Sequence, residues 1–144
     1  MNRSNWFYVK IAVVGIGFIF GLLSPFLGSS EAEYIDIMDC LIVLIFCPVG
    51  LLFVIGIQAI NPISGKIWTK PSWESNPFNF KDPLHFFHLG ALNILATSVG
   101  SFISTFFQNP TLWFPVFLYF FAGAGTLAGV QLCQFIYKKK YLAG

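Results

Sequence analysis

Apolar residues fall in three long runs along this chain, and the charged residues lie outside them. The runs contain no Lys, Arg, Asp or Glu and cover residues 11–30, 40–65 and 83–137. A helix needs about 20 apolar residues to cross the core of a bilayer, so the third run has room for two crossings. The pattern predicts an all-α integral membrane bundle of four transmembrane helices, at about 9–28, 37–60, 84–107 and 111–137.

The composition excludes a soluble domain. Hydrophobic residues make up 56% of the 144 residues, charged residues make up 10%, and the mean hydropathy is +0.74. Such a chain cannot cover itself with a polar, water-exposed surface. Four crossings use most of its length, so we expect one membrane-embedded domain over 1–144, with an interfacial loop over 61–83.

The charges predict an orientation. Arg3 and Lys10 precede the first run, three lysines lie in the 61–83 loop, and three more follow the last helix. All charged side chains in the connection after the first helix are carboxylates, namely Glu31, Glu33, Asp36 and Asp39. Because positive residues stay in the cytoplasm, we expect both termini there, in a bacterial inner membrane, and no nucleic-acid partner. A second interpretation makes residues 1–30 a cleaved signal peptide, which leaves the later loops in the same places.

The 61–83 loop combines prolines, cations and aromatic side chains. Too many of its residues are aromatic for a freely solvated loop, and the mixture of lysine and indole suits the surface of a bilayer. We expect it to lie along the cytoplasmic membrane surface and to contact lipid or a partner protein. The residues of this predicted surface are Lys66, Trp68, Lys70, Trp73, Phe78 and Phe80.

A polar stripe and two pairs of glycines mark the helix faces. Gly17 and Gly21, and likewise Gly125 and Gly129, have the spacing of packing faces in membrane helices. The stripe lies on the third helix, with residues three or four apart: Asn93, Thr97, Ser101 and Ser104. One interpretation makes it a source of hydrogen bonds between helices. The other makes it the lining of a polar path for a small solute.

The strongest candidate for site chemistry comes where the loop meets the third helix. Asp82, His85 and His88 are three residues apart, so on a helix the two imidazoles are neighbours and form a candidate metal or haem site. A simpler interpretation makes Asp82 the N-cap of a helix that starts at Pro83. The three cysteines, Cys40, Cys47 and Cys133, do not form a CxxC pair. We expect no cofactor.

Catalytic motifs such as GxSxG or HExxH do not occur in the sequence. The interfacial aromatics and glycine faces favour a non-catalytic role, in which the chain binds another membrane component as an accessory subunit, an assembly factor or a toxin-protective protein. Two alternatives stay open. One is a homo-oligomeric channel or carrier that uses the Asn93 face, and the other is a metal- or haem-binding protein.

Overall fold

The computed structural model describes residues 3–27, 36–60, 70–79, 82–108 and 113–142. These residues form four helices: α1 (Arg3–Leu27), α2 (Ile37–Ile60), α3 (Leu84–Gln108) and α4 (Trp113–Leu142). The prediction of an all-α fold with four helices long and apolar enough to cross a membrane is confirmed for the described residues. α1 starts six residues earlier than the expected 9, and α4 continues five residues past 137, because polar residues at both ends extend the helices beyond their apolar spans.

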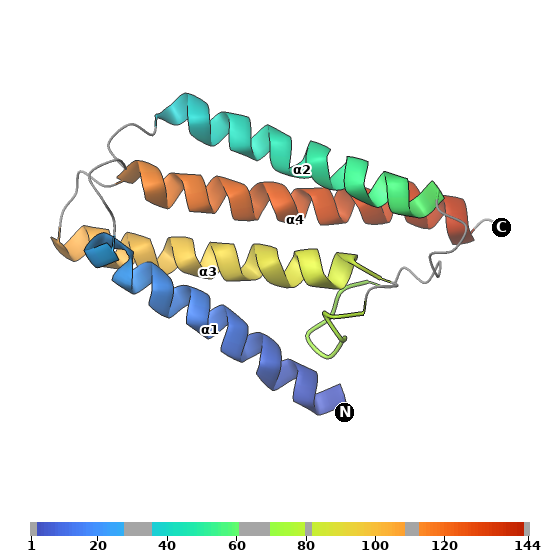
Figure 1. Ribbon diagram of the computed structural model, residues 1–144, viewed down its shortest axis with the longest axis horizontal. Helices are drawn as coiled ribbons and strands as arrows, with labels where there is room; N and C mark the ends of the chain where they lie inside the picture. Colours follow the sequence, from blue (N-terminus) through green and yellow to red (C-terminus); the bar gives the residue numbers. More distant parts are fainter. Residues whose placement is uncertain (1–2, 28–35, 61–69, 80–81, 109–112, 143–144) are drawn as a thin grey trace.

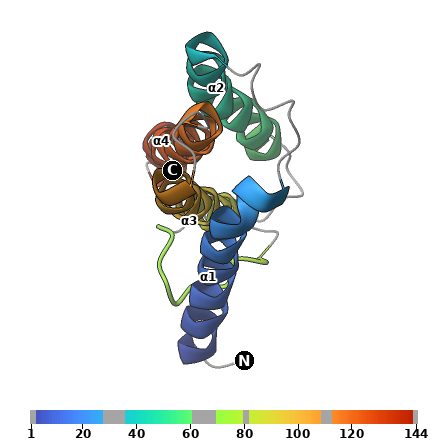
Figure 2. The same ribbon diagram turned by 90° about the vertical axis from the view of Figure 1, so that its left-hand side faces the viewer.

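The four helices form a curved row in the order α1, α3, α4, α2 (Figures 1 and 2). Extensive packing joins α1 to α3, α3 to α4, and α4 to α2, so α1 and α2 occupy the two ends of the row. Both termini lie toward the same end of the molecule, which we call the termini end (Figure 1). Asp36 and Asp39, at the start of α2, lie at the opposite end.

Glycines create the contacts between neighbouring helices. A Cβ on Gly17 would lie 2.5 Å from Asn93 Nδ2, and a Cβ on Gly21 would overlap the backbone of Thr97. On the other side of the row, a Cβ on Gly125 would lie 2.9 Å from the carbonyl oxygen of Leu44 in α2. The prediction that both glycine pairs form packing faces is therefore confirmed. Only a residue without a side chain allows helices to approach this closely.

Pro48 lies inside α2 and has no N–H to donate to the carbonyl of Leu44, four residues earlier. This carbonyl faces α4 at Gly125, and a Cβ on Gly129 would lie 2.9 Å from Pro48 Cα. The glycine face of α4 therefore packs directly against the proline-containing segment of α2. Neighbouring helices of this kind allow membrane helices to tolerate an internal proline.

Burial follows the pattern of a membrane protein. Small polar side chains such as Thr97, Ser98 and Ser101 are buried between helices, whereas large apolar side chains face outward. Phe107, for example, is 79% exposed. A water-soluble protein shows the reverse, because outward apolar surface is unfavourable in water but not in lipid.

Candidate functional site

A buried polar cluster lies at the termini end, where α1, the 70–79 segment and α3 meet. Its members are Lys10, Ser72, Ser75, Asp82 and His85. Lys10 and Asp82 are each 1% exposed, and His85 is 3% exposed. Lys10 Nζ donates to the carbonyl of Ser72 at 2.5 Å and to Ser75 Oγ at 3.0 Å. A buried ammonium group needs such acceptors, because burial removes its water.

Ser75 connects the lysine to the imidazole. Its Oγ lies 2.7 Å from His85 Nδ1, and His85 Nε2 lies 3.1 Å from Asp82 Oδ2. The Ser75 hydroxyl has one hydrogen, which is also directed at the Ser72 carbonyl, so the direction of the Ser75–His85 bond depends on the tautomer of the imidazole. Ser75 and His85 therefore link the ammonium of Lys10 to the carboxylate of Asp82.

A short turn holds Ser75 in this position. The backbone N–H of Ser75 donates to the carbonyl of Ser72 at 3.2 Å, and the N–H of Ser72 donates to Ser75 Oγ at 3.2 Å. Ser75 Oγ also lies 2.7 Å from the Ser72 carbonyl. Local bonds of this kind are why serine is common in turns. The hydroxyl has hydrogen-bonding neighbours on several sides, so the cluster fixes the loop in place.

Aromatic rings pack around the polar cluster. The ring centroids of Phe7 and Trp73 are 6.2 Å apart, and those of Trp6 and Phe78 are 6.1 Å apart. Phe78 also lies 6.4 Å from Phe86 on α3. The 70–79 segment therefore packs against the N-terminal turns of both α1 and α3. Trp73 and Phe78 remain partly exposed, as interfacial anchors are.

The structure describes only part of the surface predicted from the loop. Lys70, Trp73 and Phe78 are exposed. Lys66, Trp68 and Phe80 lie outside the described residues.

The three metal candidates do not come together. Asp82 and His85 form a pair, but no group of three His, Cys, Asp or Glu side chains within the described part of the chain could hold a metal ion. His88 lies about one turn further along α3, where it lines a small pocket that Asp82 and His85 do not line. His85 uses both ring nitrogens in the polar cluster, which leaves neither for a metal.

The polar stripe of α3 faces α1. Asn93 Nδ2 donates to the carbonyl of Val13 at 2.6 Å, and Ser101 Oγ donates to the carbonyl of Gly21 at 3.2 Å. Thr97 Oγ1 donates to the carbonyl of Asn93 at 3.0 Å within its own helix, and Ser104 is buried. Asn93, Thr97 and Ser101 therefore lie in the α1–α3 contact, where Asn93 and Ser101 hydrogen-bond the backbone of α1 and Thr97 that of its own helix.

A small pocket lies between α3, α4 and the 70–79 segment, near the termini end. Its volume is about 180 Å³. Polar side chains from three elements line it, namely Lys70, His88, Gln131 and Gln134, together with Pro71, Leu127 and Val130. His88 Nδ1 and Gln134 Nε2 are buried, and neither has a hydrogen-bond partner among the described residues. We call this the headgroup pocket.

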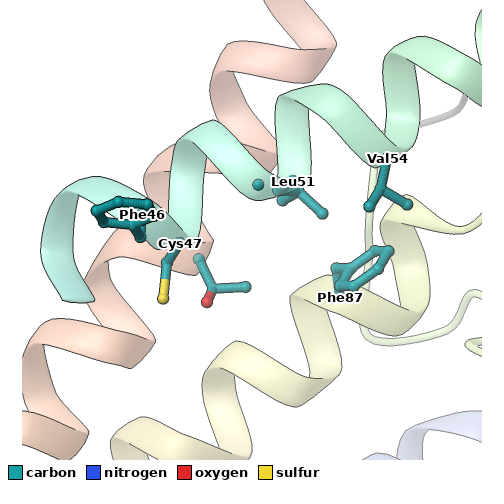
Figure 3. A pocket seen from close by; sticks show the side chains of 7 residues that line it. Phe46, Cys47, Leu51, Val54 and Phe87 are labelled. Carbon is teal, nitrogen blue, oxygen red and sulfur yellow. The ribbon is translucent and has the colours of Figure 1, made fainter. Parts of the chain in front are cut away.

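A larger groove runs between α2 and α3, with α4 behind it (Figure 3). Its volume is about 260 Å³, and its lining is almost entirely apolar. Figure 3 shows Leu51 and Val54 on α2 facing the same space as Phe87 on α3. Gly50 also lines this groove, and a Cβ added there would meet nothing within 4 Å. We call this the α2–α3 groove.

Sequence reasoning assigned Lys10 to membrane orientation and gave Ser72 and Ser75 no role. More than 60 residues separate Lys10 from its partners, so no local spacing could reveal the contact. The only available signal was the position of a lysine directly before a charge-free apolar run, which is common in membrane proteins.

The fold and these sites define an all-α protein whose helices suit a membrane and whose polar groups gather at one end. No protein-family model, curated protein or solved structure matches the chain.

Proposed function

We propose that this chain is a non-catalytic accessory protein of a bacterial inner membrane, with both termini in the cytoplasm. Its binding site is the α2–α3 groove, and the occupant is a transmembrane helix of another membrane protein. The observation that carries the proposal is Gly50, a glycine that faces open space inside an apolar groove.

The use of glycine elsewhere in the fold supports a helix as the occupant. Gly17, Gly21, Gly125 and Gly129 all bring two helix backbones together. Gly50 has the same kind of position on α2, but no neighbouring helix within the described residues approaches it. A helix backbone can approach a glycine surface closely, and such contacts drive association in lipid.

The polar groups support a non-catalytic role. Ser75, His85 and Asp82 form a chain that resembles the order of a hydrolytic triad, but Ser75 Oγ is shared between Lys10, His85 and its own turn. His85 and Asp82 are almost completely buried. This arrangement instead ties the loop to α1 and α3.

Site-specific photocrosslinking in native membranes tests the proposal. A crosslinking side chain at Val54, in the groove, is expected to capture the transmembrane segment of one other protein in a fixed position. The same group at Ile16 is the control, because Ile16 is exposed on α1 and does not line the groove. Capture of lipid alone, or of a second copy of this chain, at Val54 would contradict the proposal.

Two glycine variants give a matched comparison. A Cβ added at Gly50 or at Gly15 meets nothing within 4 Å, so we expect the chain to accommodate leucine at either position. Gly50→Leu fills the groove, and the yield of crosslinked and copurified partner is expected to fall about tenfold, the equivalent of about 1.4 kcal/mol. Gly15→Leu is expected to leave the yield unchanged. Equal behaviour of the two variants would show that the groove is not the binding site.

A further inference from the structure

We propose that the headgroup pocket binds an anionic phospholipid, with the lipid phosphate on Lys70 and Gln134 and the first part of an acyl chain along Leu127. The proposal does not depend on the α2–α3 groove or on its partner.

The depth of the pocket is the first argument. His88 lies one turn after the start of α3, and Gln134 lies one turn before Tyr137, where the apolar part of α4 ends. Both positions correspond to the edge of the hydrocarbon core, if the apolar spans fill it. The polar headgroup region of a bilayer begins at this level.

The pocket also changes from polar to apolar along its length. Lys70 and Gln134 lie toward the termini end, whereas Gln131 lies about one turn and Leu127 about two turns deeper than Gln134 on α4. An amphiphile with a polar head and an apolar chain has the same order of groups. A free anion such as inorganic phosphate would use only the polar part.

Unmade hydrogen bonds are the third argument. The buried Nε2 of Gln134 is a donor, and the buried Nδ1 of His88 can be one in the matching tautomer. Buried polar groups in proteins almost always have partners, and an exception indicates that another molecule supplies one. Phosphate oxygens are acceptors and carry negative charge, which suits two donors and the ammonium of Lys70.

The surrounding charge supports an anion rather than a cation. Lys10 and Lys70 lie at this end, and the C-terminal part of α4 adds Lys138, Lys139 and Lys140 to the same end of the fold. Clusters of basic residues at the end of membrane helices attract anionic lipids.

The test uses the purified full-length chain in nanodiscs and in detergent. Native mass spectrometry is expected to show one retained phosphatidylglycerol, and titration of phosphatidylglycerol into detergent is expected to raise the unfolding temperature more than phosphatidylcholine does. Gln134→Leu combined with Lys70→Gln is expected to weaken phosphatidylglycerol binding about tenfold. Lys138→Gln removes one charge from the same end and leaves every described residue of the pocket lining unchanged, and it is expected to change binding less than twofold.

Gln134→Leu alone provides a readout that a purely structural glutamine would not give. Because Gln134 Nε2 has no partner among the described residues, the variant is expected to be at least as stable as the original protein without added lipid, but to lose much of the stabilisation by phosphatidylglycerol. A loss of stability in both conditions would overturn the proposal.

Three further outcomes would also overturn it. One is equal weakening by Lys138→Gln and by the pocket variant, which would indicate diffuse attraction to the bilayer. The second is binding of inorganic phosphate alone, with displacement of phosphatidylglycerol, which would indicate a site for a free anion. The third is no preference for phosphatidylglycerol over phosphatidylcholine.

Discussion

At the scale of single residues, Lys10 is the most informative side chain. Its ammonium is buried near the end of an apolar helix, and the hydrogen bonds of Ser75 and His85 connect it to the carboxylate of Asp82. The ammonium of Lys10 and the carboxylate of Asp82 therefore belong to one cluster and are linked through Ser75 and His85. Networks of this kind are stabilising only when every member has partners, so removal of one member has a large effect.

Replacement of Lys10 by methionine tests this role. Lys10→Met keeps the length of the side chain but removes the donor to Ser72 and Ser75, so the 70–79 segment is expected to open more often, at a loss of about 1–3 kcal/mol. The rate of cleavage after the exposed Glu74 by a glutamate-specific protease measures the opening. Ile11→Met is the control, because Ile11 is exposed on α1 and lies outside the cluster. Equal cleavage rates in all three proteins would contradict the assignment.

A double-mutant cycle tests the link between Ser75 and His85. Their side chains lie 2.7 Å apart, so Ser75→Ala and His85→Phe are expected to be coupled by about 1 kcal/mol or more. The measurement is the free energy of unfolding in mixed micelles of a mild detergent and sodium dodecyl sulfate. Additive effects, within about 0.5 kcal/mol, would show that the two residues act independently.

At the scale of elements, the sequence predicts each helix but not its neighbours. Long apolar runs fix the four helices, because a bilayer requires helices of about 20 apolar residues. The pairs Gly17 and Gly21, and Gly125 and Gly129, predict which faces pack. Nothing in their spacing says which helix packs against which face. The contact of α1 with α3, and of α2 with α4, depends on how surfaces far apart in the chain fit together.

The same limit applies to the candidate site. Asp82 lies just before α3 and His85 lies in its first turn, a spacing that predicts that they are close, and His85 Nε2 lies 3.1 Å from Asp82 Oδ2. Their connection to α1 through Ser75 depends on the path of a loop, which local patterns do not determine. The polar stripe at Asn93 is visible in the sequence, but its contact with α1 is a property of the assembled fold.

Two alanine variants of α1 separate close packing from helix propensity. A Cβ at position 21 overlaps the backbone of α3, whereas a Cβ at position 15 meets nothing within 4 Å. Gly21→Ala is therefore expected to destabilise the protein by about 1–3 kcal/mol. Gly15→Ala is expected to be neutral or stabilising by up to about 1 kcal/mol, because alanine favours the helix. Unfolding in mixed micelles measures both, and similar values would contradict the α1–α3 contact.

At the scale of the whole molecule, the row of helices leaves broad apolar surfaces rather than an enclosed interior. Outward-facing residues such as Phe53, Phe107 and Phe135 require lipid or a partner around them. A single copy arranged in this way does not surround a water-filled path with its polar stripe, because the stripe is occupied by α1. The proposed binding of a partner at the outer surface is consistent with this shape.

The charge distribution predicts the orientation of the row. Arg3, Lys10 and Lys138 to Lys140 lie at the termini end, and Asp36 and Asp39 lie at the opposite end. A fluorescent protein fused after residue 144 is expected to fold and fluoresce, because the proposed orientation places this end in the cytoplasm. Alkaline phosphatase fused at the same position is expected to be inactive. An active phosphatase there would indicate the opposite orientation and would contradict the proposed cytoplasmic location of the loop.

The order of helices in the row has a consequence for biosynthesis. α1 and α2 leave the ribosome first, yet their main packing partners are α3 and α4, which are made later. Until its partner helix is inserted, each early helix is therefore surrounded mainly by lipid. α2, whose partner is completed last, is also the most hydrophobic of the four, and α1 is the next. The two helices that spend the longest time without a protein neighbour are therefore also the two most hydrophobic.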